Sequence, residues 1–256
     1  MSQAFERDGV TLYCGDCLDI LPELEEGSVD AVVTDPPYGI REKMGVMRTR
    51  AGYGDGRATG VRTLQFPWDG DGVQSVVCKG LGLAFGLCSK DAACSIWTGF
   101  DSANAYAEVA RKAGFRVKPM AWVKKCPPPA GYGNYWPSAF ELGFYATRGK
   151  VWFGDDDVKR RNVWTYDSYR HGQPGKVNHP TQKPLRMIVH HVRAWVPPHG
   201  LCLDPFMGSG TTGVACVQMG RRFIGVEREA KYVDIAVRRI EAAMDETPLF
   251  SLSEQE

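Results

Sequence analysis

Four consecutive residues, Asp35-Pro36-Pro37-Tyr38, carry groups suited to chemistry on an amine. They come directly after the apolar run 29–34, so they should project from the carboxyl end of a strand, where open α/β sheets place their sites. Two prolines stiffen the chain, which would fix the Asp35 carboxylate and the Pro36 carbonyl as acceptors for an NH2 group. Tyr38 offers a flat face for stacking a nucleobase. An ordinary turn is the structural alternative.

A second segment, residues 203–212, has the glycines of a cofactor-binding turn between a strand and a helix. Gly208 and Gly210 would allow a sharp turn and a close approach of the ligand to the backbone. The segment lacks both the usual third glycine of dinucleotide folds and the Gly-Lys-Ser/Thr ending of triphosphate loops. Glu227 ends the next apolar run, where dinucleotide folds hold ribose hydroxyls. The pattern favours an adenosine-bearing cofactor over a tight turn followed by a surface glutamate.

Apolar runs alternate with helical patterns along the chain, which predicts one α/β domain over residues 1–256 with a mostly parallel sheet. The predicted strands are residues 10–15, 29–34, 93–98, 117–123, 140–146, 201–204 and 223–227. Helical spacing marks segments around 103–113, 185–196 and 232–243. The first of these should begin near Asp101 or Ser102 and stop at Gly114.

Two stretches interrupt this alternation, and both are candidates for contact with a nucleic acid. Residues 39–72 are rich in glycine and predict a mobile loop or insertion, and residues 148–178 interleave basic and aromatic side chains. We take 148–178 as the candidate target-recognition region and the acidic tail 245–256 as flexible. For each basic residue, a simply solvated side chain is the alternative. The candidate DNA contacts are Arg41, Lys43, Arg48, Arg50, Arg57, Arg160, Arg161 and Arg170.

The composition is that of an ordinary globular protein, with 43% hydrophobic and 24% charged residues in a chain of 256. No run approaches ~18 apolar residues and no secretory signal layout opens the chain, so we expect a cytoplasmic protein without a membrane anchor. Because the net charge is only +1, binding to a polyanion would depend on local basic surfaces. Only Cys14 and Cys17 form a CxxC pair, so we expect reduced thiols and no metal site.

Three ordered motifs give the sequence a resemblance to the amino-group DNA methyltransferases, which use S-adenosylmethionine and act on adenine-N6 or cytosine-N4. The motifs are residues 35–38, residues 204–210 and the hexapeptide 179–184 (His-Pro-Thr-Gln-Lys-Pro), with secondary matches at 14–17, 140–143 and 225–227. The catalytic tetrapeptide precedes the glycine loop, as in the β group of that family. The resemblance implies a single Rossmann-like class I methyltransferase domain with a seven-stranded, mostly parallel sheet and a circularly permuted motif order.

The resemblance also implies roles for individual residues. Asp35, Pro36, Pro37 and Tyr38 would be catalytic. Asp16 and Cys17 would contact the adenine of the cofactor, Glu227 its ribose hydroxyls and Lys183 its methionine carboxylate. The implied cofactor-binding residues are Asp16, Cys17, Asp35, His179, Thr181, Lys183, Asp204, Pro205, Phe206, Gly208, Ser209, Gly210, Thr211 and Glu227.

The implied activity is methyl transfer to the N6 amine of an adenine flipped out of double-stranded DNA. The aspartate of the tetrapeptide favours adenine, and cytosine-N4 is the alternative base. A module that binds cofactor and DNA without turnover is the alternative of another class, and an RNA substrate stays open. The chain has no Pro-Cys dipeptide, which cytosine-C5 enzymes need. A homodimer and a cognate restriction endonuclease are the expected protein partners.

Overall fold

The computed structural model describes residues 2–38, 72–125, 138–154, 161–169 and 173–246, whose strands form one sheet of nine in the order β1-β2-β9-β8-β3-β4-β6-β5-β7. The strands are β1 Ser2–Arg7, β2 Val10–Cys14, β3 Val29–Thr34, β4 Cys88–Thr98, β5 Arg116–Lys124, β6 Phe140–Arg148, β7 Val163–Tyr166, β8 Leu201–Asp204 and β9 Arg222–Glu227. The expected α/β class with a mostly parallel sheet is confirmed.

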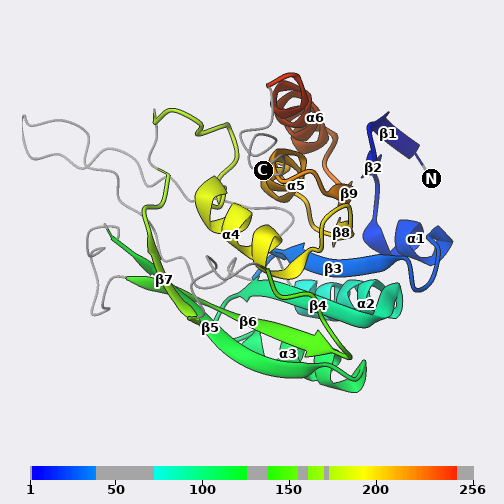
Figure 1. The fold of residues 1–256 in the computed structure, drawn as a ribbon. Coiled ribbons are helices and arrows are strands. Elements are labelled where there is room, and N and C mark those ends of the chain that lie inside the picture. Colours follow the sequence, from blue (N-terminus) through cyan, green and yellow to red (C-terminus); the bar gives the residue numbers. More distant parts are fainter. Residues whose placement is uncertain (1, 39–71, 126–137, 155–160, 170–172, 247–256) are drawn as a thin grey trace, which may run out of the picture.

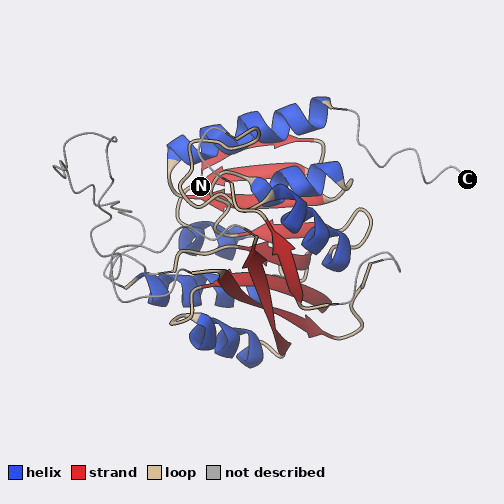
Figure 2. Cartoon of the chain, turned by 90° about the vertical axis from the view of Figure 1, so that its left-hand side faces the viewer, coloured by secondary structure: helices blue, strands red, loops and turns tan. Residues whose placement is uncertain are grey.

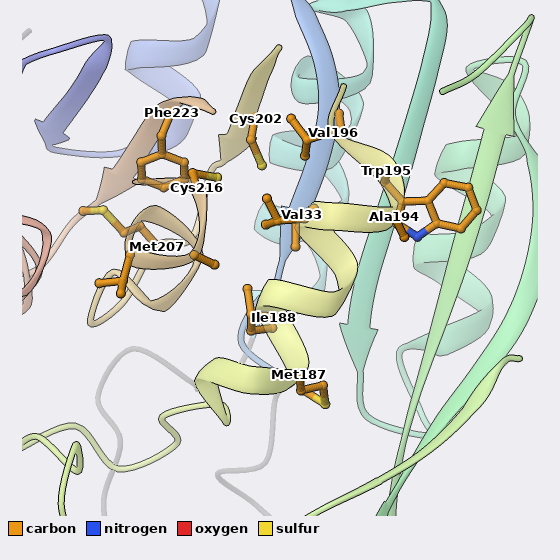
Figure 3. Close-up of a cluster of buried hydrophobic side chains, with 14 of the residues drawn as sticks. Val33, Met187, Ile188, Ala194, Trp195, Val196, Cys202, Met207, Cys216 and Phe223 are labelled. Atoms are coloured by element: carbon orange, nitrogen blue, oxygen red, sulfur yellow. The ribbon is translucent and has the colours of Figure 1, made fainter. Parts of the chain in front are cut away.

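Helices cover both faces of the sheet, α1 to α3 on one side and α4 to α6 on the other (Figures 1 and 2). The helices are α1 Cys17–Ile20, α2 Val73–Gly86, α3 Ala103–Lys112, α4 Leu185–Trp195, α5 Thr211–Gln218 and α6 Ala230–Asp245, and a 3-10 turn Leu21–Glu23 follows α1. Alternate residues of β3 face opposite layers: Val33 packs with α4 and α5, as Figure 3 shows, while Val32 packs under α2 and α3. The central strand is therefore buried on both faces.

Five neighbouring strands, β2, β9, β8, β3 and β4, are parallel, so their carboxyl ends meet at one edge of the sheet. The loops that leave this edge begin after Cys14, Glu227, Asp204, Thr34 and Thr98. Strand β6 runs antiparallel to β4, with Leu142 opposite Thr98, and thus brings its beginning to the same edge. Segments far apart in the chain therefore meet there.

The expectation of seven strands is wrong because two edge strands extend the sheet. The seven expected strands are present as β2 to β6, β8 and β9. Strand β1 adds antiparallel to β2 through a tight turn at Asp8 and Gly9, both at positive φ (49° and 79°). Strand β7 lies within the region 148–178, which is therefore not wholly irregular, and buries Trp164. The helix at 103–112 begins after Ser102 and is followed by Gly114 at φ +85°, as expected.

Several expectations fall on residues outside the described ranges. Of the predicted insertion 39–72 the structure describes Gly72 alone, which precedes α2, and the tail is described up to residue 246. Among the described parts of the chain, no helix combines the length and apolar character needed to span a bilayer. The described cysteines carry free thiols, and burial raises the pKa of Cys17 to about 12.

Candidate active site

A cavity of about 790 Å³ opens at the carboxyl edge of the sheet and contains both predicted corners. The expected site residues that line it are Asp16, Cys17, Asp35, Pro36, Pro37, Tyr38, His179, Thr181, Lys183, Asp204, Pro205, Phe206, Gly208, Ser209, Thr211 and Glu227. Among the expected catalytic and cofactor-binding residues, all of which lie in the described part of the chain, only Gly210 does not line the cavity. The Asp-Pro-Pro corner and the glycine loop thus share one cleft.

Sheet register explains why the two corners meet. Strands β3 and β8 are parallel neighbours, with Ala31 opposite Cys202 and Val32 opposite Leu203. Asp35 comes directly after β3, and Asp204 ends β8. Parallel neighbours with matched register deliver their next loops to the same place, although 170 positions separate the strand ends Thr34 and Asp204.

Helix α3 and the residue before it hold the tetrapeptide by two hydrogen bonds. The Tyr106 hydroxyl donates to the Pro37 carbonyl at 3.0 Å, and the Ser102 hydroxyl donates to the Tyr38 carbonyl at 3.3 Å. A Cβ on Gly99 would lie 3.2 Å from the Tyr38 Cβ, so glycine there lets the Tyr38 backbone and side chain pack close to the end of β4. The corner is rigid through its prolines and through these bonds.

The Asp35 carboxylate has a partner on each oxygen. The Tyr38 hydroxyl donates to Oδ1 at 2.5 Å, and the Lys183 ammonium donates to Oδ2 at 2.5 Å. Burial raises the pKa of Asp35, and the charge of Lys183 acts against that rise. Each carboxylate oxygen has two lone-pair sites, so both oxygens can still accept one more hydrogen bond from a substrate.

Lys183 in turn bridges two carboxylates. Its Nζ lies 3.1 Å from Glu141 Oε2, and Glu141 Oε1 lies 2.9 Å from Lys124 Nζ. Burial alone would raise the pKa of Glu141, but Lys183 and Lys124 outweigh it and lower that pKa. Asp35, Lys183, Glu141 and Lys124 form a group that we call the charge cluster, two acids with two bases in the floor of the cavity.

Asp204 ties the glycine loop to β3. Its carboxylate accepts from the Thr34 hydroxyl at 2.6 Å, from the Thr212 hydroxyl at 2.8 Å and from the Phe206 amide at 3.1 Å. Burial raises the pKa of Asp204 to about 7 even though these three bonds favour the carboxylate. Asp204, which was expected to bind the cofactor, therefore also joins the two halves of the site.

Glu227 lies across the mouth of the glycine loop. Its Oε2 accepts from the Gly208 amide at 2.9 Å and its Oε1 from the Glu229 amide at 2.8 Å. His179 packs on the other side of Gly208, where an added Cβ would come within 3.1 Å of the imidazole Nε2. Burial and nearby cations lower the pKa of His179 to about 4, so its imidazole is neutral at pH 7.

Gly210 serves the packing of the glycine loop on α6. It has φ +75°, and an added Cβ would lie 2.7 Å from the Cβ of Ala236. Beside it, the Arg239 guanidinium donates to the Ser209 carbonyl at 2.5 Å and to the Thr211 hydroxyl at 3.1 Å. Helix α6 thus supports the loop on both sides of Gly210.

Of the predicted DNA contacts, the structure describes Arg161, whose side chain is exposed. The other seven lie outside the described residues. Arg148 opens the predicted recognition region but points inward, where it donates to the carbonyls of Ala113, Cys88 and Ser89. Two exposed aromatic side chains, Phe100 (83% exposed) and Phe140 (53%), line the cavity instead.

The site contains residues that sequence reasoning did not single out. Glu141 lay within a quoted secondary match, 140–143, but its contact with Lys183 depends on the antiparallel return of β6. Lys124 ends β5, which pairs with β6 at the same edge. Arg239 lies inside an amphipathic helix, where a cation ordinarily faces water. No spacing pattern marks the Lys124 and Arg239 contacts in advance.

The fold matches those of solved structures over nearly the whole chain. It matches the structure of the M1.HpyAVI–SAM complex with a TM-score of 0.69 and 24% identity, over 90% of this chain and 98% of that one. It matches the PvuII DNA methyltransferase (cytosine-N4-specific) with a TM-score of 0.68 and 16% identity, over 95% of this chain and 93% of the other. The expected Rossmann-like class I fold is confirmed.

Residues 29–238 match the family model N6_N4_Mtase, described as DNA methylase, and the chain belongs to this family. It is 25% identical to the type II methyltransferase M2.MboI of Moraxella bovis, over 92% of this chain and 89% of that protein. It is 27% identical to the type II methyltransferase M.HinfI of Haemophilus influenzae, over 90% of this chain and 68% of the relative. The amino-group DNA methyltransferase expected from the three motifs is confirmed.

Proposed function

We propose that this DNA methyltransferase moves a methyl group from S-adenosylmethionine to the exocyclic N6 amine of adenine in double-stranded DNA. The observation that carries the proposal is the shared cleft: the Asp35 corner and the Gly208 loop come after neighbouring parallel strands and line one cavity. An acceptor for an amine and a turn for a nucleoside cofactor are the two parts that this reaction needs.

The cavity fits S-adenosylmethionine in size and in the groups that line it. Its volume of about 790 Å³ lies within the usual range for cofactor sites. Glu227 retains free lone pairs on both oxygens and would accept from the two ribose hydroxyls, while Asp16 and Cys17 would contact the adenine ring. Phe206, Gly208 and the rest of the glycine loop would surround the methionine part. Bound, this cofactor supplies an electrophilic methyl group on a sulfonium.

The residues of the corner would make the amine reactive. An exocyclic amine is a poor nucleophile because its lone pair is delocalised into the ring. Hydrogen bonds from its two N–H groups to the Asp35 carboxylate and the Pro36 carbonyl would localise that lone pair, and the fixed geometry would supply much of the rate. Asp35 can also accept the proton released on transfer.

The base must leave the duplex to reach this corner, since the target atom is inaccessible inside the stack. Tyr38 would then stack on the extruded ring, and Phe100 and Phe140, which are exposed and line the cavity, would offer further aromatic contacts to the DNA. Aspartate in the tetrapeptide supports adenine as the target base. Arg161 is the described candidate for a phosphate contact, together with the basic residues of 41–57 and with Arg160 and Arg170.

The relatives named type II methyltransferases support a role in a restriction–modification system, with a cognate endonuclease as partner. A homodimer belongs to the same proposal and is measured by analytical ultracentrifugation. A DNA substrate and relatives from bacteria support action in the cytoplasm.

The test is incubation with S-adenosylmethionine and unmethylated DNA, and then nucleoside mass spectrometry. We expect N6-methyladenine from the unaltered protein and none from Asp35→Ala, whose cofactor affinity by calorimetry should be retained. Asp234→Ala, which removes an exposed acid from α6, is the matched control. N4-methylcytosine would support the alternative base, and full turnover by Asp35→Ala would contradict the proposed chemistry.

A further inference from the structure

Lys183 is buried, and burial of a lysine ammonium costs free energy unless the charge is paired. Its side chain is 7% exposed, and its ion pairs with Asp35 and Glu141 in the charge cluster offset the cost of removing the ammonium from water. The charges of the cluster sum to zero when Lys124 is counted, and this balance allows four ionised groups to lie together in a largely buried place.

Two hydrogen bonds and one ion pair surround the ammonium of Lys183. Nζ lies 2.5 Å from Asp35 Oδ2, 3.1 Å from the Tyr38 hydroxyl oxygen and 3.1 Å from Glu141 Oε2. Lys183 was expected to bind the methionine carboxylate, but its observed partners belong to the catalytic end of the cavity.

We propose that Lys183 is a positioning residue that keeps Asp35 ionised and aimed at the amine, and that Glu141 holds the Lys183 ammonium in place. This inference rests on the proposed function of Asp35. The carboxylate that accepts from the amine is then held by a cation bound to one of its oxygens.

The electrostatic argument comes from the surroundings of Asp35. Burial raises the pKa of this carboxyl, and Lys183 is the cation that opposes the rise, while the negative charge of Glu141 adds to it. The other ionisable groups that face Asp35 are Tyr38 on its own loop and Asp204 at the end of β8, and neither brings a positive charge. Lys124 lies behind Glu141. Lys183 is thus the cation in contact with Asp35 in the described structure.

Two substitutions should move the pH profile in opposite directions. Lys183→Met removes the cation, so a protonated Asp35 persists to higher pH. Glu141→Gln removes a negative charge but keeps an oxygen that can accept from Lys183, so Asp35 should ionise at lower pH. A purely structural role would not produce opposite shifts.

The experiment measures the single-turnover rate of methyl transfer to unmethylated plasmid DNA against pH, with saturating radiolabelled S-adenosylmethionine. For Lys183→Met we expect a rate about 100-fold lower at pH 7, in the range of lost general acid–base assistance. Its acid limb should rise by about one to three pH units, while cofactor affinity by calorimetry stays within about twofold. Lys183→Arg should return the limb toward its original position.

Glu141→Gln should lose no more than about tenfold in rate, with its acid limb shifted down, because the amide still orients Lys183. Lys112→Met and Glu26→Gln, which alter exposed side chains of the same types, are the matched controls, and thermal melting checks folding. If Lys183→Met does not fold, the downward shift in Glu141→Gln decides the matter.

Two results would overturn the inference. One is weakened cofactor binding by Lys183→Met with a normal rate at saturation, which would make Lys183 a cofactor contact. The other is an acid limb that does not move in either variant. Asp35→Asn separates this inference from the proposed function: if that variant turns over normally, the role of Asp35 itself fails, whereas an inactive Asp35→Asn beside unshifted Lys183→Met rejects the positioning role alone.

Discussion

Replacing Gly210 by alanine should destabilise the protein by two separable effects. Gly210 has φ +75°, a region that costs an alanine about 1 kcal/mol relative to glycine. The added Cβ would also lie 2.7 Å from the Cβ and 3.0 Å from the Cα of Ala236, closer than carbon atoms pack. Helix α6 would have to move away from the loop, and such overpacking costs typically about 1–3 kcal/mol. The sum is about 2–4 kcal/mol.

Gly27 offers a matched control for the backbone contribution. It has φ +73°, but no atom lies within 4 Å of a Cβ built on it. Gly27→Ala should therefore lose only about 1 kcal/mol, and the difference between the two variants isolates the clash with α6. Ala236→Gly in combination with Gly210→Ala removes the nearest Cβ and should recover part of that difference.

The assay is urea denaturation monitored by circular dichroism, with the free energy of unfolding taken by linear extrapolation. Calorimetry on the same samples should show weaker S-adenosylmethionine binding by Gly210→Ala, since Ser209 and Thr211 flank the displaced residue. An equal loss of stability in Gly210→Ala and Gly27→Ala would refute the packing argument.

Three further outcomes are expected. Glu227→Ala should weaken S-adenosylmethionine binding at least about tenfold because charge-assisted hydrogen bonds are lost, while the rate at saturating cofactor is retained. Calorimetry measures the affinity, and an unchanged value would count against the ribose contact. Burial lowers the pKa of His191 to about 3, so the folded protein binds fewer protons than the unfolded chain between pH 3 and 6.5. Its unfolding free energy should fall as the pH drops through that window, by up to about 1.4 kcal/mol per unit, and His191→Gln should flatten the slope in urea titrations. DNA affinity measured by fluorescence anisotropy should fall steeply between low and moderate salt, whereas a flat response would contradict phosphate-led binding.

Exposed residues of matched type serve as controls for these variants. Glu26→Ala should leave cofactor affinity unchanged, because Glu26 is exposed outside the cavity lining. His199→Gln, which alters an exposed histidine, is the matched control for His191→Gln.

The central strands were predictable because their burial on both faces demands apolar runs such as Val29–Thr34, and a glycine loop after one of them is a strong signal. Strand β1 was not predictable in this way, because Ser2–Arg7 is mostly polar and becomes a strand only through its pairing with β2. The Asp8-Gly9 turn was the available hint.

The cleft itself was predicted from order and spacing, but the partners within it were not. Lys183 was expected to bind the cofactor carboxylate because the sequence around it does not reveal its contact with Glu141. That contact depends on the antiparallel pairing of β6 with β4. Gly210 was assigned to the cofactor by its motif, whereas its packing against Ala236 depends on where α6 lies. Contacts of this kind depend on tertiary placement, which local pattern does not encode.

The hydrogen bond between Thr34 and Asp204 joins residues 170 positions apart, and this separation bears on biosynthesis. During translation the Asp35 corner leaves the ribosome long before its complementary loop has been made. Closing so long a loop is slow relative to local folding. We therefore expect the nascent chain to be inactive until its last quarter has emerged. Amino- and carboxyl-terminal fragments expressed separately should each be inactive and should regain methylation only when they reassociate.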